Sequence, residues 1–405
     1  MTENRSRRKA LVVGAGITGL ATAIRLRQIG WEPVLIERAP ERRTGGYFIM
    51  LFGTGAAAAR RLGALDAIGT RGGPGVTTYE IDRQGRRRPG LSIVDLSGSP
   101  RPLLRGDVEN GLFQALPADV EIRYSTVPSA IEQNDDEARV ELHDLATGTR
   151  TTESFDLVVG ADGLRSTVRR LAFGDGTFVH PLNYMIAATV LDRPVDGFGQ
   201  SEGLVLAEPG RSAATFAFAD HAPSLLFSYR TADVDAEFQR APIDSLRAAF
   251  GPEPAGPVLE ELFQRYEQAP DALFDSVMQV RMPRWHRGRV VLVGDAAWCL
   301  TLYSGMGAST GMAGGDLLGT LLQQHPDDVP GALGAWETRL RPFITDHQAA
   351  ALNERLIFVP QNRREQVMRA GMIRMMRSPG LRNTLGRLMP ATNALMEAKN
   401  VDIAA

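Results

Sequence analysis

Residues 10–19 read ALVVGAGITG, an apolar segment that runs into a glycine-rich turn. A helical pattern of apolar residues follows as far as Gly30, and a second apolar segment, residues 33–36, ends at Glu37. This order predicts a strand, a helix and a second strand, which together form a βαβ unit.

Three glycines and one acid in this unit have the spacing of a dinucleotide-binding motif. Gly14, Gly16 and Gly19 allow a tight turn, close approach of the backbone to a pyrophosphate, and close packing of helix on sheet. Glu37 is placed to accept hydrogen bonds from the hydroxyls of an adenosine ribose. The alternative is a glycine-rich turn in an unrelated α/β protein. The unit therefore predicts a bound ADP moiety, without choosing between NAD and FAD.

Two later motifs each place an aspartate after a buried strand. Residues 155–169 read FDLVVGADGLRSTVR and residues 289–297 read RVVLVGDAA. A carboxylate at the end of such a strand can accept hydrogen bonds from a nucleotide, while the next helix directs free N–H groups toward it. The alternative for Asp162 and Asp295 is that each caps the following helix.

Together the three motifs resemble the fingerprints of the FAD-dependent aromatic hydroxylases, the single-component flavoprotein monooxygenases of the p-hydroxybenzoate hydroxylase type. The resemblance extends over most of residues 10–345 in the same order. It implies noncovalent FAD, with NADPH or NADH as electron donor and dioxygen as co-substrate. The implied reaction hydroxylates or epoxidises a small aromatic or polyketide-like molecule through a flavin C4a-hydroperoxide.

The implied fold class is α/β, with a Rossmann-like FAD-binding domain, an interleaved β-sheet substrate domain and C-terminal helices. We expect a discontinuous FAD-binding domain at residues 1–78, 101–176 and 274–345. We expect the substrate-binding sheet at residues 79–100 and 177–273, and a C-terminal helical segment at residues 346–405.

The resemblance also implies which residues contact the cofactors. Arg105 matches the family arginine that reaches the FAD pyrophosphate or ribityl chain, and Arg165 and Arg169 are expected near the phosphates of the nicotinamide cofactor. The full expected FAD-binding set is Gly14, Gly16, Thr18, Gly19, Glu37, Arg38, Arg105, Asp162, Gly163, Gly294, Asp295, Gly305, Gly307 and Ala308.

The chain departs from the family pattern in the loop that faces the flavin. Residues 298–309 read WCLTLYSGMGAS, with Thr301 and Leu302 where the family commonly has prolines. This is similar to a subgroup that includes the tetracycline-modifying monooxygenases. The altered loop leaves two alternatives open, an FAD enzyme without oxygen transfer, such as an oxidase or cyclase, and a flavin- or ligand-binding resistance protein.

Substrate contacts are expected from the second sheet and from the segment after Gly46. Each candidate has the alternative of being an ordinary core residue. The six histidines occupy no motif position, so the catalytic residue is not identified. The candidates for the substrate site are Tyr47, Met50, Phe52, Phe216, Phe227, Tyr229, Met278 and Arg281.

Composition narrows the possible partners. The chain has 405 residues and a net charge of −2, which argues against nucleic-acid binding because that needs a basic excess. The single cysteine, Cys299, leaves no cysteine pair for a disulfide or a metal site, and no metal-ligand motif is present. We expect a cytoplasmic protein, monomeric or homodimeric and without integral membrane association. Its Arg- and Met-rich segment 361–389 is expected to form a capping helix on the substrate domain or in a dimer interface, with binding to an anionic membrane or an acidic partner as the alternative.

Overall fold

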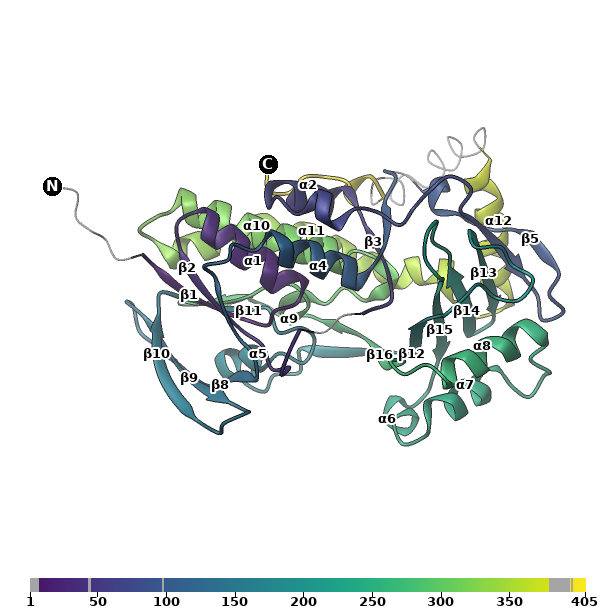
Figure 1. The fold of residues 1–405 in the computed structure, drawn as a ribbon, viewed down its shortest axis with the longest axis horizontal. Coiled ribbons are helices and arrows are strands. Elements are labelled where there is room, and N and C mark those ends of the chain that lie inside the picture. Colours follow the sequence, from purple (N-terminus) through teal and green to yellow (C-terminus); the bar gives the residue numbers. More distant parts are fainter. Residues whose placement is uncertain (1–6, 43–44, 97, 379–393, 395) are drawn as a thin grey trace.

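The computed structural model describes residues 7–42, 45–96, 98–378, 394 and 396–405. The described chain forms two lobes, joined in the middle of Figure 1 by the neighbouring strands β12 (Val179–Val190) and β16 (Leu273–Val280).

The first lobe contains a six-stranded sheet in the order β17-β18-β11-β1-β2-β7. All neighbouring pairs are parallel except β17 with β18. Its core strands are almost wholly apolar, as expected for a parallel sheet covered on both faces. The strands are β1 (Lys9–Val13), β2 (Glu32–Ile36), β7 (Glu121–Arg123), β11 (Leu157–Gly160), β17 (His286–Arg287) and β18 (Val290–Leu292).

Helices on this lobe include a packed pair, α1 and α10, whose close approach depends on glycine. A Cβ at Gly315 of α10 would lie 2.4 Å from Thr22 Oγ1 of α1. A three-stranded antiparallel sheet, β8 to β10, flanks the lobe beside α5 (Figure 1). These elements are α1 (Ile17–Gln28), α4 (Arg105–Ala115), α5 (Thr167–Phe173), α10 (Gly307–Gln324), α11 (Val329–Phe358), β8 (Thr126–Gln133), β9 (Ala138–Asp144) and β10 (Arg150–Phe155).

The second lobe is a seven-stranded sheet in the order β16-β12-β15-β14-β13-β4-β5. One face packs on helices α7 and α8, and this interface forms the second hydrophobic core. The further elements of this lobe are β4 (Thr77–Ile81), β5 (Arg87–Pro89), β13 (Glu202–Glu208), β14 (Arg211–Phe216), β15 (Ser224–Arg230), α6 (Val234–Glu237), α7 (Pro242–Phe250) and α8 (Pro257–Glu267).

Short elements connect the lobes and bring the loops of the site together. β3 and β6 pair antiparallel, and Arg105 N–H continues that ladder by donating to the Tyr47 carbonyl at 3.0 Å. The short elements are α2 (Gly53–Arg61), α3 (Leu65–Ile68), β3 (Phe48–Leu51), β6 (Arg101–Leu104), α9 (Asp295–Trp298) and the 3₁₀ helices η1 (Ile93–Asp95) and η2 (Leu302–Ser304).

The Arg- and Met-rich segment forms helix α12 (Arg363–Arg377), and the rest of it, from residue 379 onward, lies outside the described residues. Arg369 is buried and pairs with Glu80 of β4, its Nη2 lying 2.8 Å from Oε1. Gln366 donates to the Ala207 carbonyl of β13 at 3.0 Å. The described part of this segment therefore packs on the substrate sheet.

The fold class is confirmed, but two expected domain boundaries differ from the elements. β16 belongs to the seven-stranded sheet, so that sheet extends beyond residue 273 to Val280. Helix α11 runs without a break through residue 345. Pro342 lies inside it and removes one backbone hydrogen bond, but the helix continues on both sides. The expected boundary between residues 345 and 346 therefore falls inside a helix.

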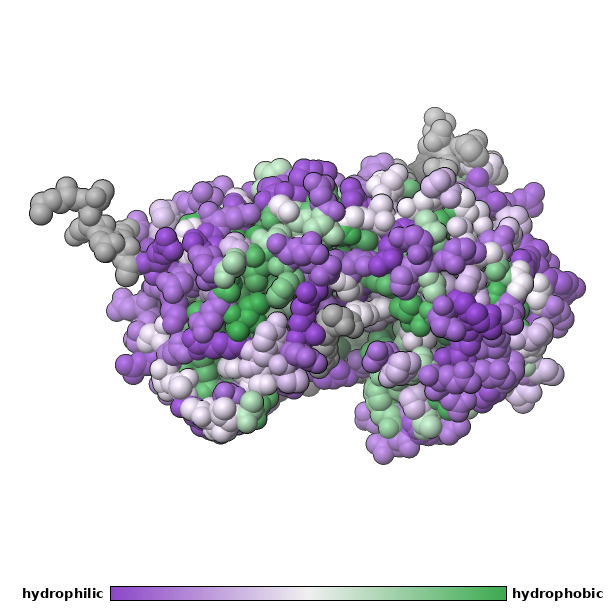
Figure 2. Space-filling view, viewed as in Figure 1, coloured by the Kyte–Doolittle hydropathy of each residue, from purple (hydrophilic) through white to green (hydrophobic). Residues whose placement is uncertain are grey.

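The surface is mainly hydrophilic on the face shown in Figure 2, with apolar residues gathered over α1 and α4 and a hollow between the lower parts of the lobes. Among the described helices, none combines the length and the apolar character needed to cross a bilayer.

Candidate functional site

The glycine turn after β1 is built so tightly that side chains are excluded. Gly14 has φ +100°, and a Cβ there would lie 2.6 Å from the Ala161 carbonyl oxygen. A Cβ at Gly19 would lie 1.8 Å from the Gly14 oxygen, so Gly19 lets α1 pack against the turn. At Gly16, where α1 begins, no side chain in the described chain caps the helix, which leaves its first amides free to face a ligand.

Glu37 lies where β2 ends, beside this turn. Its Oε2 accepts a hydrogen bond from Ala15 N–H at 3.0 Å and its Oε1 accepts one from Ala39 N–H at 2.9 Å. These bonds fix the carboxylate at the edge of a groove of about 540 Å³, here called the outer groove. Arg38 also lines the outer groove and donates to Thr167 Oγ1 at 3.3 Å.

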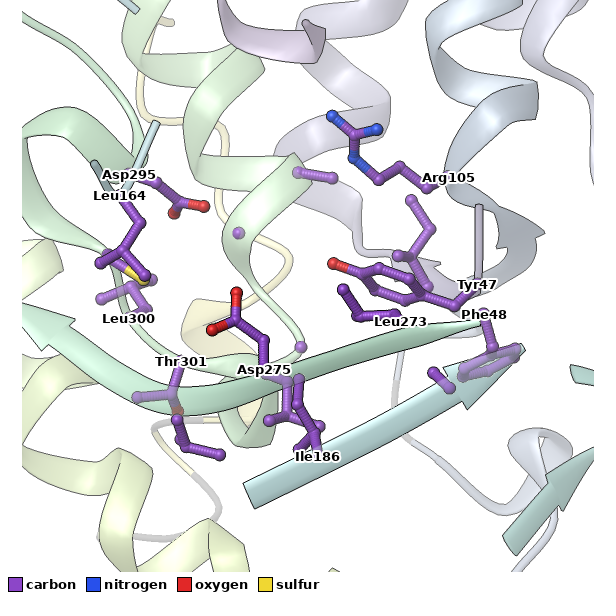
Figure 3. Close-up of a pocket in the computed structure, with 18 of the residues that line it drawn as sticks. Tyr47, Phe48, Arg105, Leu164, Ile186, Leu273, Asp275, Asp295, Leu300 and Thr301 are labelled. Atoms are coloured by element: carbon purple, nitrogen blue, oxygen red, sulfur yellow. The ribbon is translucent and has the colours of Figure 1, made fainter. Parts of the chain in front are cut away.

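The outer groove continues into a second space of about 380 Å³, the inner cavity, which lies between the two lobes. Both spaces share part of their walls, so they form one elongated site. Figure 3 shows the inner cavity, with Arg105 above Tyr47 and the two carboxylates Asp275 and Asp295 directed inward. The shared wall residues are Gly16, Arg105, Ala161, Gly163 and Leu164.

Arg105 is the first residue of α4 and faces the junction of the two spaces. Its Nη2 lies 2.7 Å from Glu109 Oε1, and its side chain remains 39% exposed. A guanidinium that is partly solvated and held by one carboxylate keeps donors for a phosphate. Arg105 therefore lies where the middle of an extended dinucleotide would pass.

Asp295 follows β18 and faces the inner cavity. Its side chain is exposed to the cavity, yet protein surrounds the site closely enough for desolvation to raise the pKa of the carboxyl group, while the charge of Arg105 and a hydrogen bond with Cys299 oppose the rise. Gly294, with φ +68°, is buried; a Cβ there would lie 2.5 Å from Thr18 Oγ1. Gly294 therefore shapes the turn, whereas Thr18 and Asp295 line the cavity.

Asp162 lies in the wall of the outer groove, and its carboxylate accepts hydrogen bonds at the start of α5. Its Oδ1 accepts from Ser166 Oγ at 2.5 Å, and its Oδ2 accepts from the amides of Thr167 and Val168 at 2.6 and 3.1 Å. The carboxylate thus caps α5, the alternative considered for it. Gly163 has open space beside it in the wall of both spaces, since no described atom beyond Gly163 and its chain neighbours lies within 4 Å of the place a Cβ would take.

The two arginines of the same motif differ from each other. Arg169 is buried and donates to the Ala296 and Leu164 carbonyls at 2.8 and 2.6 Å. The expectation that it lies near a nicotinamide phosphate is wrong, because its guanidinium is used to join two backbone segments. Arg165 is exposed and pairs with Asp275, whose Oδ1 lies 2.8 Å from its Nη2.

The altered loop forms the wall of the inner cavity opposite Arg105. Thr301 has φ +83°, a conformation that costs a β-branched residue about 1–3 kcal/mol. Its Oγ1 is buried and has no hydrogen-bond partner among the residues that the structure describes. Gly305 is left-handed, and Gly307 and Ala308 begin α10, so the first turn of that helix faces the cavity.

Apolar side chains from both lobes complete the inner cavity. Of the expected substrate residues, Tyr47, Met50, Phe216 and Met278 line it. Burial raises the pKa of the Tyr47 phenol, which favours its neutral form. Phe48, which the sequence did not single out, stacks on Phe216 with ring centroids 4.0 Å apart.

Four expected substrate residues lie elsewhere. Phe227 and Tyr229 point to the opposite face of β15 and pack in the core formed with α7 and α8. Arg281 is exposed beyond the end of β16 and donates to Gln279 Oε1 at 2.7 Å. Phe52 is 1% exposed and belongs to the core of the first lobe. Phe227 and Tyr229 were misplaced because side chains alternate between the two faces of a strand and both faces of this sheet are buried, so an apolar residue there can face either the core or the cavity.

Asp275 is the charged cavity residue that sequence reasoning missed. It lies on β16, and most residues of that strand line the cavity, including Ser276 and Val277. Among the described residues, no group of three or more His, Cys, Asp or Glu side chains is arranged to hold a metal ion.

The donors and acceptors along the site suit FAD. Glu37 provides a ribose-binding carboxylate at one end, free amides of α1 and Arg105 face the place of the pyrophosphate, and Asp295 lies beyond them. Gly163 and Gly307 leave room for close backbone contact. The length and the polarity of the site therefore fit an extended flavin dinucleotide.

Comparisons with known proteins agree with this geometry. Residues 7–328 match the family described as "FAD binding domain". A "Flavin-dependent monooxygenase" from an unknown prokaryotic organism is 27% identical over 349 residues, covering 84% of this chain and 87% of that protein.

Two solved structures have closely similar folds. The tetracycline destructase Tet(55) has a TM-score of 0.76 and 25% identity, covering 91% of this chain and 96% of its own. Klebsiella pneumoniae HpxO, solved with FAD and uric acid, has a TM-score of 0.76 and 20% identity, covering 97% and 96% of the two chains.

Proposed function

This chain belongs to the FAD binding domain family and is an FAD-dependent flavoprotein monooxygenase, and from this premise we propose that it uses NADPH or NADH and O2 to oxygenate a neutral aromatic or polyketide-like molecule in the inner cavity. The observation that carries the proposal is the continuity of the outer groove with the inner cavity through Arg105 and Gly163. A dinucleotide that fills the groove has one end in the apolar cavity.

FAD, when bound, accepts hydride from the nicotinamide cofactor and activates O2 for transfer to the substrate. The chain would hold its adenosine ribose with Glu37 and its pyrophosphate with Arg105 and the first amides of α1. Asp295 would accept from the ribityl hydroxyls. The first turn of α10, at Gly307 and Ala308, directs its positive end toward the flavin end of the site and would favour negative charge on the bound cofactor.

The cavity wall indicates a substrate without a negative charge. Among the described wall residues, the charged ones are Asp275, Asp295 and Arg105; Asp275 is paired with Arg165, and the free donors of Arg105 are assigned to the FAD pyrophosphate. A substrate carboxylate would therefore lose its hydration beside two acidic side chains and gain no cation of its own. Neutral molecules with aromatic surface suit the stack of Phe48 and Phe216.

The chain also excludes water around the reacting atoms. Leu225, Leu226 and Val277 line the cavity from the second sheet, and Leu300 and Leu302 line it from the altered loop. A dry cavity protects activated oxygen from wasteful release as hydrogen peroxide. The requirement for NADPH or NADH and the single cysteine favour a cytoplasmic site of action.

An isotope experiment tests the proposal. Purified, FAD-loaded protein is supplied with NADPH or NADH under ¹⁸O2, with tetracycline and uric acid as probes because the two structural neighbours are named with these compounds. A panel of neutral phenols and polyketides extends the search. We expect a product that carries one ¹⁸O atom and faster NAD(P)H oxidation with the true substrate.

Other outcomes identify the alternatives. Substrate oxidised without gain of ¹⁸O, or turned over without NAD(P)H, would indicate an oxidase or cyclase. Unchanged compound recovered from a tight complex would indicate a binding protein.

A further inference from the structure

The described C-terminal tail, residues 396–405, returns to the first lobe and lies on α2. Thr54 Oγ1 donates to the carbonyls of Lys399 and Val401 at 2.9 and 2.6 Å. Gly53 N–H donates to Asn400 Oδ1 at 3.0 Å, and Arg61 pairs with Asp402 at 2.5 Å. The end of the chain is therefore anchored by several contacts apart from the side chain of Lys399.

Lys399, one of two lysines in the sequence, directs its ammonium group inward from this tail. The residue is 4% exposed. Its Nζ donates to the Ser304 carbonyl at 2.8 Å, lies 2.5 Å from Glu354 Oε1 of α11 and lies 5.1 Å from the centroid of the Phe52 ring. A buried ammonium is retained as an ion where partners of this kind replace its water.

Ser304 connects this ammonium to the wall of the inner cavity. Its Oγ donates to the Thr301 carbonyl at 3.0 Å and accepts from Met306 N–H at 3.1 Å. Two hydrogen bonds in series therefore link Lys399 to Thr301. Thr301 has a strained φ, and such a backbone conformation persists only where surrounding contacts hold it in place.

We propose that Lys399 is a positioning residue for oxygen transfer, which holds Ser304 and thereby keeps the loop of Thr301 to Gly305 against the flavin end of the site. Anchoring of the tail does not require this lysine, because Thr54 and Arg61 hold the tail independently. The ammonium instead supplies a charge-assisted bond to a loop that is strained. The consequence for oxygen transfer rests on the proposed function, whereas the hold on the loop does not.

Hydrogen–deuterium exchange of residues 301–306 in FAD-free protein tests the hold on the loop directly. Lys399→Met removes the donor and is expected to speed exchange in this segment by about tenfold or more. Lys399→Arg, which keeps the charge and the donors, is expected to restore slow exchange in part. Asp402→Asn is the matched control, since it weakens tail docking at Arg61 and leaves the loop contact intact.

Ser304→Ala provides a second route if Lys399→Met does not fold. It removes the Oγ that joins the two hydrogen bonds, so it is expected to loosen the same amides. The double variant Lys399→Met/Ser304→Ala is expected to differ little from either single variant, because both interrupt one chain of contacts. Fully additive effects of the two substitutions on exchange would overturn the proposed link from Lys399 through Ser304 to Thr301.

The loaded enzyme gives the second readout. In Lys399→Met the visible absorption spectrum of bound FAD is expected to shift, and the hydrogen peroxide released per NAD(P)H is expected to rise several-fold, while Asp402→Asn resembles wild type. Unchanged loop exchange in Lys399→Met and Ser304→Ala, or an equal change in Asp402→Asn, would overturn the proposal. Loop loosening without any FAD binding would instead count against the proposed function alone.

Discussion

The Glu37 carboxylate accepts a hydrogen bond from the Ala15 amide at 3.0 Å, which joins the end of β2 to the glycine turn after β1. The acid that is expected to hold the ribose is thus fixed by the same turn that is expected to hold the pyrophosphate. One short contact aligns two parts of the dinucleotide site.

Replacement of this acid is predicted to weaken FAD binding. Glu37→Gln removes the charge that strengthens hydrogen bonds to ribose hydroxyls, and we expect the Kd for FAD to rise about tenfold, or about 1.4 kcal/mol. Titration of FAD-free protein with FAD measures it. Glu32→Gln, at the exposed opposite end of β2, is the control. Equal affinities in the Glu37 variant and wild type would contradict the assignment.

Relief of strain in the altered loop is predicted to stabilise the protein. Thr301→Gly removes the cost of a β-branched residue at φ +83° and an unpartnered buried hydroxyl, so we expect the free energy of unfolding to rise by about 1 kcal/mol in FAD-free protein. Chemical denaturation measures this change. Thr310→Gly, in the first turn of α10, should instead destabilise, because Thr310 has helical backbone and a buried hydroxyl that accepts a hydrogen bond from Trp298. A loss of stability in Thr301→Gly would show that the strain is not present.

A buried histidine is predicted to make stability depend on pH. Burial first, and then the charge of Lys399, lower the pKa of His347 to about 4. The unfolded chain binds a proton near pH 6.5, so stability is present above that pH and is lost as the pH falls toward 4. The shift corresponds to about 3 kcal/mol. Denaturation midpoints between pH 4 and 7 measure it.

His347→Leu should flatten this pH dependence, because it removes the group that must be protonated on unfolding. His143→Leu, on β9 of the small flanking sheet, is the comparison for the loss of a histidine outside this buried site. If the dependence of stability on pH persists in the His347 variant, other titratable groups cause it.

Two phenylalanines on neighbouring strands are predicted to behave differently. Phe227 is fully buried and stacks on Phe263 at 5.4 Å, so Phe227→Ala should cost about 3–5 kcal/mol of stability. Phe216 lines the inner cavity, so Phe216→Ala should cost less and should raise the KM for the substrate identified under ¹⁸O2. Denaturation and steady-state kinetics separate the two effects. The reverse order of stabilities would contradict the assignment of faces.

Local sequence patterns predicted the parts of the site that depend on local geometry. The glycine spacing identified the turn at Gly14, because backbone conformation and helix packing there restrict the residue type. The sequence also predicted the place of Asp295, because this residue follows a recognisable apolar strand. The order of strands and helices in the first lobe followed from these units.

Other features depend on contacts between distant residues and gave no such signal. The alternation in β15 could not tell which buried face Phe227 joins, since apolar side chains occupy both faces. The pattern around Arg169 did not reveal that its guanidinium reaches the Ala296 carbonyl. Lys399 contacts a loop 95 residues earlier in the chain, which no short motif encodes.

Quantitative FAD titration of wild-type protein tests the central claim most directly. The account predicts that the chain binds one FAD noncovalently, that the cofactor is released on denaturation, and that Glu37→Gln and Arg105→Met weaken binding while Glu32→Gln does not. A correctly folded preparation that stays colourless and does not take up FAD would contradict it.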